Sequence, residues 1–183
     1  MNKVNNINKS IAKLEGIGFV IVSIAGTLLH FVYDRSGKNK IVGLFAPVNE
    51  SPFEHLKLLF FPFIIYAVFE VIKLSDSKFN VSFAKLIGIL CGTGATLSVF
   101  YICEGALGKS IDAVNIASFF IGIGVAFLVS YHIIKSSKGR GFINGMSAAL
   151  LIVISIVFIY FTLYPIEIPL FKDPTNMSYG ISG

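Results

Sequence analysis

Five stretches of about 20 mainly apolar residues follow one another along this 183-residue chain, and no other feature limits its fold as strongly. A helix of about 20 residues crosses the hydrocarbon layer of a bilayer, which is about 30 Å thick. In lipid, every backbone polar group needs a partner within the protein, so spanning segments are helices or closed barrels, and the alternating pattern of barrel strands is absent here. The sequence therefore predicts an all-α integral membrane bundle. Its expected spans, within a single domain of residues 1–183, are residues 14–33, 53–74, 83–103, 113–134 and 142–164.

The charged residues are too few for a soluble surface. They make up 14% of the chain, whereas soluble domains carry roughly 25%. The net charge of +5 does not indicate nucleic-acid binding, because the basic residues sit in short loops and form no basic stripe. The expected surroundings are a lipid bilayer, in a multi-pass arrangement in the cell membrane. A membrane-protein partner or a second copy of the chain stays open.

The orientation is predicted from the loops, because cytoplasmic loops are enriched in lysine and arginine. Nine of the fifteen basic residues fall on the side of the N-terminus, and six fall on the other side. This bias predicts a cytoplasmic N-terminus and an external C-terminus. The nine are Lys3, Lys9, Lys13, Lys73, Lys78, Lys85, Lys135, Lys138 and Arg140, and the six are Arg35, Lys38, Lys40, Lys57, Lys109 and Lys172.

Small residues recur four positions apart in the third and fourth spans. Gly88 and Gly92 form one such pair, and Ser118, Gly122 and Ala126 form a longer row. Faces of this kind let two helix backbones approach closely. The pattern predicts contacts between helices at these positions.

Polar residues gather at the predicted outer ends of the spans, whereas the inner side carries mostly lysines. Ionisable groups at membrane depth are costly and often mark a functional site. The sequence therefore predicts a polar site in the outer half of the bundle. Its candidate ligand-binding residues are His30, Asp34, Asn49, Glu50, Glu54, His55 and Glu104.

A metal site is one interpretation of this group. His30 and Asp34 are four residues apart, so Asp34 would lie on the same helix face and could orient the imidazole. A zinc site needs three or four protein ligands. His30 and His55 with Glu54 could supply three, and Glu50 or Glu104 could replace Glu54. No local zinc motif is present, so the sequence requires no cofactor and leaves zinc open beside hydrogen bonding between helices and a proton, ion or headgroup site.

The start of the second span carries a helix-capping pattern. Ser51 and Glu54 are spaced as in a capping box, with Pro52 at the first helical position. We expect the Ser51 side chain to accept from the Glu54 amide, and Glu54 to reach back to the Ser51 amide. Glu54 and Lys57 are three apart and are expected to pair on the helix surface.

Two further segments on the predicted outer side are apolar but too short to span a bilayer. Residues 41–48 and 166–174 both contain proline, which prevents a regular helix through them. We expect them to lie at the interface or to fold over the mouth of the bundle.

Residues 44–62 (LFAPVNESPFEHLKLLFFP) resemble a signature of a family of small uncharacterised bacterial membrane proteins. Residues 30–34 (HFVYD), residues 168–174 (IPLFKDP) and Tyr179-Gly180 are similar to that family too. Pro52-Phe53 departs from it, because a small or β-branched residue followed by Trp is expected there. The resemblance implies a bacterial cell-membrane protein and implies no activity.

Three functions are compatible with these patterns. The leading hypothesis is a protein that binds or transports a small ligand, an ion or a lipid headgroup at the outer polar site. Under this hypothesis the protein is a binding or transport protein rather than an enzyme. The second is a membrane-embedded metal-dependent hydrolase, in which zinc activates water. The third is a structural or accessory membrane subunit, in which the polar group only joins helices.

Overall fold

The computed structural model describes residues 2–74, 79–108, 111–136 and 141–181, and these residues form helices and connections with no strand. Five helices are long, and two short helices and one 3-10 turn complete the fold. In chain order they are α1 (Asn2–Leu29), α2 (Val32–Arg35), α3 (Lys40–Gly43), α4 (Pro52–Lys73), α5 (Val81–Leu107), α6 (Asp112–Ser136), α7 (Gly141–Leu163) and η1 (Pro169–Phe171).

The five long helices are all long and apolar enough to cross a membrane. Their outward faces carry large apolar side chains, with exposed fractions of 73% at Ile65, 69% at Ile102 and 78% at Phe142. Such extensive apolar surface is unfavourable in water and suited to lipid tails. The predicted all-α bundle, with five helices long and apolar enough to span a membrane, is confirmed, and its apolar outer faces suit contact with lipid.

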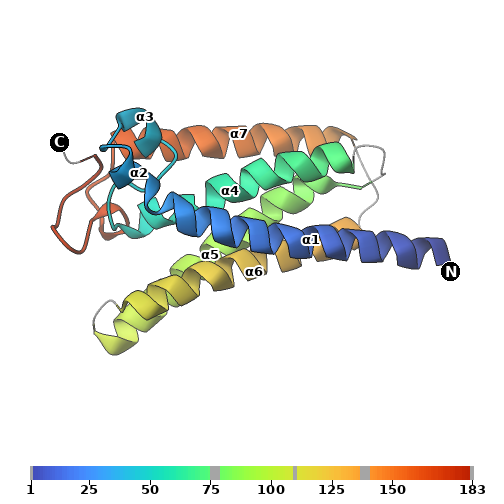
Figure 1. Ribbon diagram of the computed structural model, residues 1–183, viewed down its shortest axis with the longest axis horizontal. Coiled ribbons are helices and arrows are strands. Elements are labelled where there is room, and N and C mark those ends of the chain that lie inside the picture. Colours follow the sequence, from blue (N-terminus) through green and yellow to red (C-terminus); the bar gives the residue numbers. More distant parts are fainter. Residues whose placement is uncertain (1, 75–78, 109–110, 137–140, 182–183) are drawn as a thin grey trace.

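The two ends of the bundle differ in what they carry. The N-terminus and the C-terminus lie at opposite ends, as an odd number of spans requires (Figure 1). At one end α1 finishes, α4 begins, and both His30 and His55 are found, so we name it the histidine end. The other end, where α1 begins and α4 finishes, is named the opposite end.

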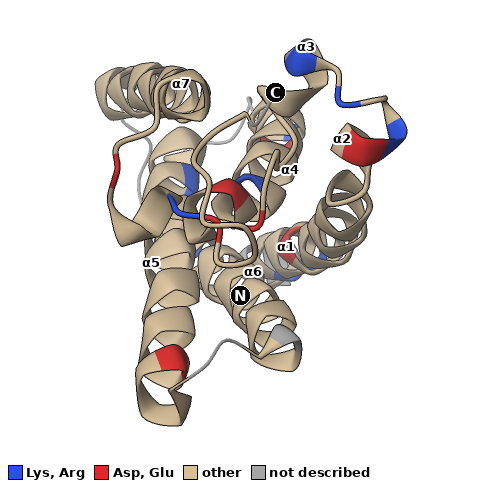
Figure 2. Ribbon diagram, turned by 90° about the vertical axis from the view of Figure 1, so that its left-hand side faces the viewer, with Lys and Arg blue, Asp and Glu red and all other residues tan. Residues whose placement is uncertain are grey.

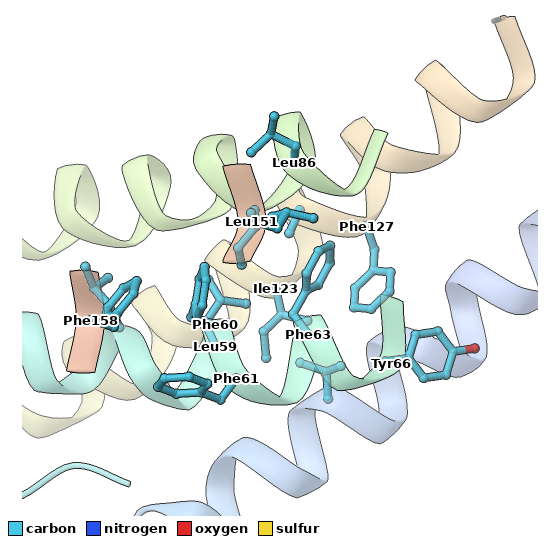
Figure 3. Close-up of a cluster of buried hydrophobic side chains, with 14 of the residues drawn as sticks. Leu59, Phe60, Phe61, Phe63, Tyr66, Leu86, Ile123, Phe127, Leu151 and Phe158 are labelled. Atoms are coloured by element: carbon cyan, nitrogen blue, oxygen red, sulfur yellow. The ribbon is translucent and has the colours of Figure 1, made fainter. Parts of the chain in front are cut away.

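Helix α4 is the centre of the bundle. In its most apolar window 61% of the residues are buried, against 22–39% in the other four spans. Phe60, Phe63 and Leu59 on α4 are almost fully buried and pack with Ile123 and Phe127 of α6 (Figure 3). Because most of α4 is enclosed by protein, its buried faces can carry the polar residues that a lipid-exposed face could not.

Helices α5 and α6 pack through their small residues, as predicted. A Cβ atom on Gly92 would lie 2.6 Å from the Gly122 carbonyl oxygen, and one on Gly88 would lie 2.6 Å from the Ala126 carbonyl oxygen. Backbones this close leave no room for a larger side chain. At the histidine end this pair diverges from α1, α4 and α7 (Figure 1), and that divergence leaves space for a cavity.

Some boundaries differ from those expected. Helix α1 starts at Asn2 and ends at Leu29, whereas the expected span was residues 14–33. Lys85 lies inside α5 and Lys57 inside α4, and neither side chain is exposed, so neither is a loop residue. Removing one from each side leaves eight basic residues against five, and the predicted bias stays. Lys78, Lys109, Lys138 and Arg140 lie outside the described residues.

The segment joining α1 to α4 and the C-terminal tail both fold over the histidine end (Figure 1). Phe171 of η1 is buried against Phe53 of α4, with ring centroids 4.4 Å apart. Residues 41–48 include most of α3 and reach back to α4, where Lys57 donates to the carbonyl oxygens of Gly43 and Ala46. The predicted covering of the bundle mouth is thus observed.

Candidate functional site

Two histidines and one carboxylate converge at the histidine end. His30 follows the last residue of α1, Glu50 precedes the N-cap of α4, and His55 lies in the first turn of α4. The Nε2 atom of His55 is 3.3 Å from Glu50 Oε2, and Nε2 of His30 is 4.0 Å from Glu50 Oε1. The two imidazole rings have centroids 5.4 Å apart. One potential ligand atom from each of the three residues lies within 4.8 Å of the others.

The orientation of His55 is fixed by the helix on which it lies. Its Nδ1 is 3.1 Å from the Ser51 carbonyl oxygen. A carbonyl oxygen only accepts, so we assign the proton to Nδ1, and the lone pair of Nε2 then faces Glu50. A lone pair directed at a carboxylate is unfavourable unless a proton or a metal cation lies between them. Histidine ligands of metals are commonly held by this kind of hydrogen bond from the other ring nitrogen.

His30 and Glu50 complete the group from two less regular segments. Among the described residues, the buried Nδ1 of His30 has no hydrogen-bond partner. About half of the Glu50 side chain is exposed, and a third of the His30 side chain. The three side chains therefore lie at the protein surface of the histidine end, where an ion can reach them.

A cavity of about 230 Å³ adjoins Glu50 and His55. It lies between the start of α4, the diverging helices α5 and α6, and the C-terminal tail. Its polar lining residues besides those two are Thr96, Asn115, Ser118 and Thr175. Phe100 and Phe119 give it an apolar wall, so the cavity combines a few polar groups with apolar surface, as small-molecule sites do.

The C-terminal tail holds Glu50 in place. The Glu50 amide donates to Asp173 Oδ2 at 3.2 Å, and Asn49 donates through its side chain to the Gly180 carbonyl oxygen at 3.0 Å. Burial alone would raise the pKa of Asp173, but the hydrogen bonds it accepts from Thr175, Glu50 and Asn176 outweigh burial and lower the pKa. Acidic residues lie on α2, at the beginning of α4 and along the tail, and basic residues lie on α3 and in the segment between α2 and α3 (Figure 2).

Glu54 is not beside the histidines. It is 2% exposed, and its carboxylate accepts from the Val48 amide at 3.0 Å, from Lys57 Nζ at 2.6 Å and from the Thr162 hydroxyl at 3.2 Å. The expected surface pair with Lys57 is thus a buried pair. Glu54 joins α4 to α7 and to the preceding segment.

One half of the expected capping box forms. The Ser51 hydroxyl accepts from the Glu54 amide at 3.4 Å, with Pro52 at the first helical position. The reverse bond was predicted wrongly, because the Ser51 amide donates to Asn49 Oδ1 at 2.9 Å instead. Asn49 replaces Glu54 in that role, and this leaves Glu54 available for Lys57.

Asp34 and Glu104 also lie away from the histidine pair. The prediction that Asp34 shares a helix face with His30 was wrong, because α1 ends at Leu29 and Asp34 belongs to the separate helix α2, where it is exposed. Glu104, in the last turn of α5, lines a neighbouring cavity of about 210 Å³ together with Tyr101 and Lys172. Neither residue belongs to the group of possible ligand atoms that His30, Glu50 and His55 form.

A second polar cluster was missed by the sequence analysis. Glu15, Glu70 and Lys85 lie on three different helices near the opposite end, and each is at most 4% exposed. The signal was present, since a glutamate within an apolar span costs roughly 2.5–3.5 kcal/mol near the bilayer centre and is rarely without a role. Lys85 was taken as a loop residue, which hid the third member.

The fold and the buried polar groups define a multi-pass membrane protein with five spans. A family model matches residues 1–181, and the chain belongs to that family, DUF6512, a family of unknown function. No curated protein and no solved structure matches the chain. The expected membership of an uncharacterised family is confirmed.

Proposed function

We propose that this protein binds an ion at its histidine end, and that the ion is a divalent transition metal such as zinc. His30, Glu50 and His55 would be its ligands. Nitrogen and carboxylate ligands suit zinc, which binds them at about 2.0–2.2 Å. In a tetrahedral site, ligand atoms at that distance lie about 3.3 Å from one another.

The observation that carries the proposal is the convergence of these three side chains from separate segments. The distance from His55 to Glu50 is 3.3 Å, which already equals the spacing within a zinc site, and the 4.0 Å from His30 to Glu50 needs only a small closure. The hydrogen bond from His55 Nδ1 to Ser51 supports the same reading, because it leaves Nε2 as the ligand atom.

Metal analysis of the purified protein tests the proposal. After removal of metal with a chelator and reloading with zinc chloride, we expect about one tightly bound zinc per chain. His30→Ala and His55→Ala should each bind zinc at least about tenfold more weakly, since even residues that only support a ligand change affinity by this factor. The measurement is zinc content by mass spectrometry, with affinity by titration calorimetry.

His132→Ala is the matched control. His132 is exposed on α6 and its Nδ1 lies 2.8 Å from the Leu128 carbonyl oxygen, so it resembles His55 locally but has no carboxylate beside it in the described residues. Zinc binding should be unchanged in this variant. A wild-type protein that retains no zinc, or a His55→Ala variant that binds it normally, would refute the site.

A hydrolase is the second candidate, because three protein ligands leave a fourth position for water. The cavity of about 230 Å³ beside Glu50 and His55 has room for part of a substrate. Zinc-loaded protein would then release fatty acid from lipid vesicles or cleave a peptide, and His55→Ala would abolish that release. Zinc binding without any such turnover favours the binding protein.

We further propose that the bundle lies in a bacterial cell membrane with the histidine end outside. The excess of basic residues at the opposite end supports this orientation, and the resemblance of residues 44–62 supports the source. A reporter enzyme that works only in the cytoplasm, fused after Gly183, is expected to be inactive. The same reporter fused before Met1 is expected to be active, and the reverse result would overturn the orientation.

A further inference from the structure

Four helices contribute to a buried polar cluster near the opposite end of the bundle. Its members are Glu15 of α1, Glu70 of α4, Lys85 of α5 and Ser130 of α6, and none is more than 4% exposed. Glu70 lies three residues before the end of α4 and Lys85 four residues after the start of α5. The cluster is therefore about one helical turn inside the span ends.

Glu15 has all the hydrogen bonds of an ionised carboxylate. Both of its oxygens accept from Lys85 Nζ at 2.9 Å, and Oε1 also accepts from the Ser130 hydroxyl at 2.9 Å. An ammonium group that bonds both oxygens stabilises the charged form strongly. Glu15 and Lys85 together are neutral.

Glu70 is the surplus acid in this arrangement. Its Oε2 forms an ion pair with Lys85 Nζ, but among the described residues neither of its two oxygens has a hydrogen-bond partner. Tyr66, one turn earlier on α4, does not supply one, because its hydroxyl donates to the Leu14 carbonyl oxygen at 2.8 Å. The cluster thus contains two carboxylates and one ammonium group, and among the described residues the Glu70 carboxylate accepts no hydrogen bond.

Among the residues that the structure describes, the neighbouring elements supply no second cation to this cluster. The sequence of α7, which packs against α5, contains no acidic or basic residue. The lysines at this end that the structure describes are exposed, namely Lys9, Lys13, Lys73 and Lys135. If all three buried groups are charged, the cluster holds a net negative charge in surroundings of low dielectric, which is costly.

We propose that this cluster is a proton-binding site and that Glu70 carries the exchangeable proton. One bound proton makes the cluster neutral. A metal cation is disfavoured there, because the ammonium group of Lys85 lies between the two carboxylates and would repel it.

The structure also offers an approach to the cluster. Glu15 lines a cavity of about 500 Å³ between α1 and α6, together with Gly16, Gly124 and Tyr131. A proton that reaches Glu15 from the cavity has only the Lys85 ammonium group between it and Glu70. This site is separate from the histidines and would operate whether or not a metal binds to them.

Infrared spectroscopy of the full-length protein in detergent micelles tests the proposal, because a protonated carboxyl group has its own carbonyl stretching band. At neutral pH the wild-type protein should show such a band, and exchange into deuterium oxide should shift it. Glu70→Gln should lack the band. Glu167→Gln, which removes an exposed glutamate from the C-terminal tail, is the matched control and should keep it.

Glu15→Gln makes the test independent of the side chain that carries the proton. In this variant Glu70 and Lys85 form a neutral pair, so no proton is needed and the band should disappear although Glu70 is intact. Absence of the band from the wild type, or its persistence in Glu15→Gln, would overturn the proposal. Loss of the wild-type band on addition of sodium chloride would also overturn it, because a sodium ion would then be the ligand.

Discussion

Lys85→Met is expected to lower the free energy of unfolding by at least ~3–5 kcal/mol, the range measured when one member of a buried ion pair is removed. Lys85 is fully buried, and it bonds both oxygens of Glu15 and pairs with Glu70. Its Nζ also lies 4.9 Å from the centroid of the Phe127 ring. Methionine retains the packing against that ring but leaves two buried acids without a cation. Unfolding in detergent micelles, followed by circular dichroism, measures the loss.

Two comparisons separate charge from packing in this experiment. Lys13→Met removes an exposed lysine of α1 near Glu15 and should change stability by no more than about 0.5 kcal/mol. Combining Lys85→Met with Glu15→Gln and Glu70→Gln removes every charge in the cluster and should recover most of the loss. If Lys85→Met is as stable as Lys13→Met, the buried ion pairs do not support this fold.

The span pattern and the small-residue faces were predictable because both depend on local sequence. A stretch of about 20 apolar residues requires a helix in lipid whatever its neighbours are. Gly92 and Gly122 lie on neighbouring helices, and a Cβ atom on Gly92 would lie only 2.6 Å from the Gly122 carbonyl oxygen, so only glycine permits that approach. Such features need no knowledge of which helix packs beside which.

The membership of the polar clusters was harder to predict. The predicted spans place His30 and His55 at the same end of the bundle. No feature of the sequence favours Glu50 over Glu54 as their neighbour. That choice depends on Asn49, whose Oδ1 accepts the hydrogen bond of the Ser51 amide. Glu54 is then not needed for that bond and accepts from Lys57 instead. Alternatives of this kind are settled by tertiary hydrogen bonds, which a helical pattern does not encode.

The end of α1 shows the same limit. His30 and Asp34 have the spacing of one helix face, but the helix stops at Leu29 and restarts at Val32. The break turns the chain so that the Nε2 of His30 approaches Glu50. No proline lies at this break, so it was hard to predict from the pattern of residues.

Lys57 contributes both to the stability of the fold and to the arrangement of the histidine end. Its replacement is therefore expected to lower both the free energy of unfolding and the zinc affinity. Its Nζ donates to Glu54 Oε2 at 2.6 Å and to the Gly43 carbonyl oxygen at 2.9 Å, and neither Lys57 nor Glu54 is more than 2% exposed. Lys57→Met should therefore lower the free energy of unfolding by ~3–5 kcal/mol, since it leaves the Glu54 carboxylate buried without its cation. Lys73→Met, at the exposed end of the same helix, is the matched control.

The same variant tests whether the covering segment holds the proposed zinc ligands. Lys57 fixes the Gly43 carbonyl, and Glu54 fixes the Val48 amide, two residues before Glu50. Loss of the Lys57 bond to Gly43 loosens the covering segment and frees Glu50 to move away from His30 and His55, so zinc affinity should fall about tenfold or more although Lys57 touches no ligand atom. Glu54→Gln combined with Lys57→Met removes both charges and should recover stability without recovering zinc affinity, because a methionine cannot donate to Gly43. Full zinc affinity in that double variant would show that Glu50 is held by the Asp173 contact alone.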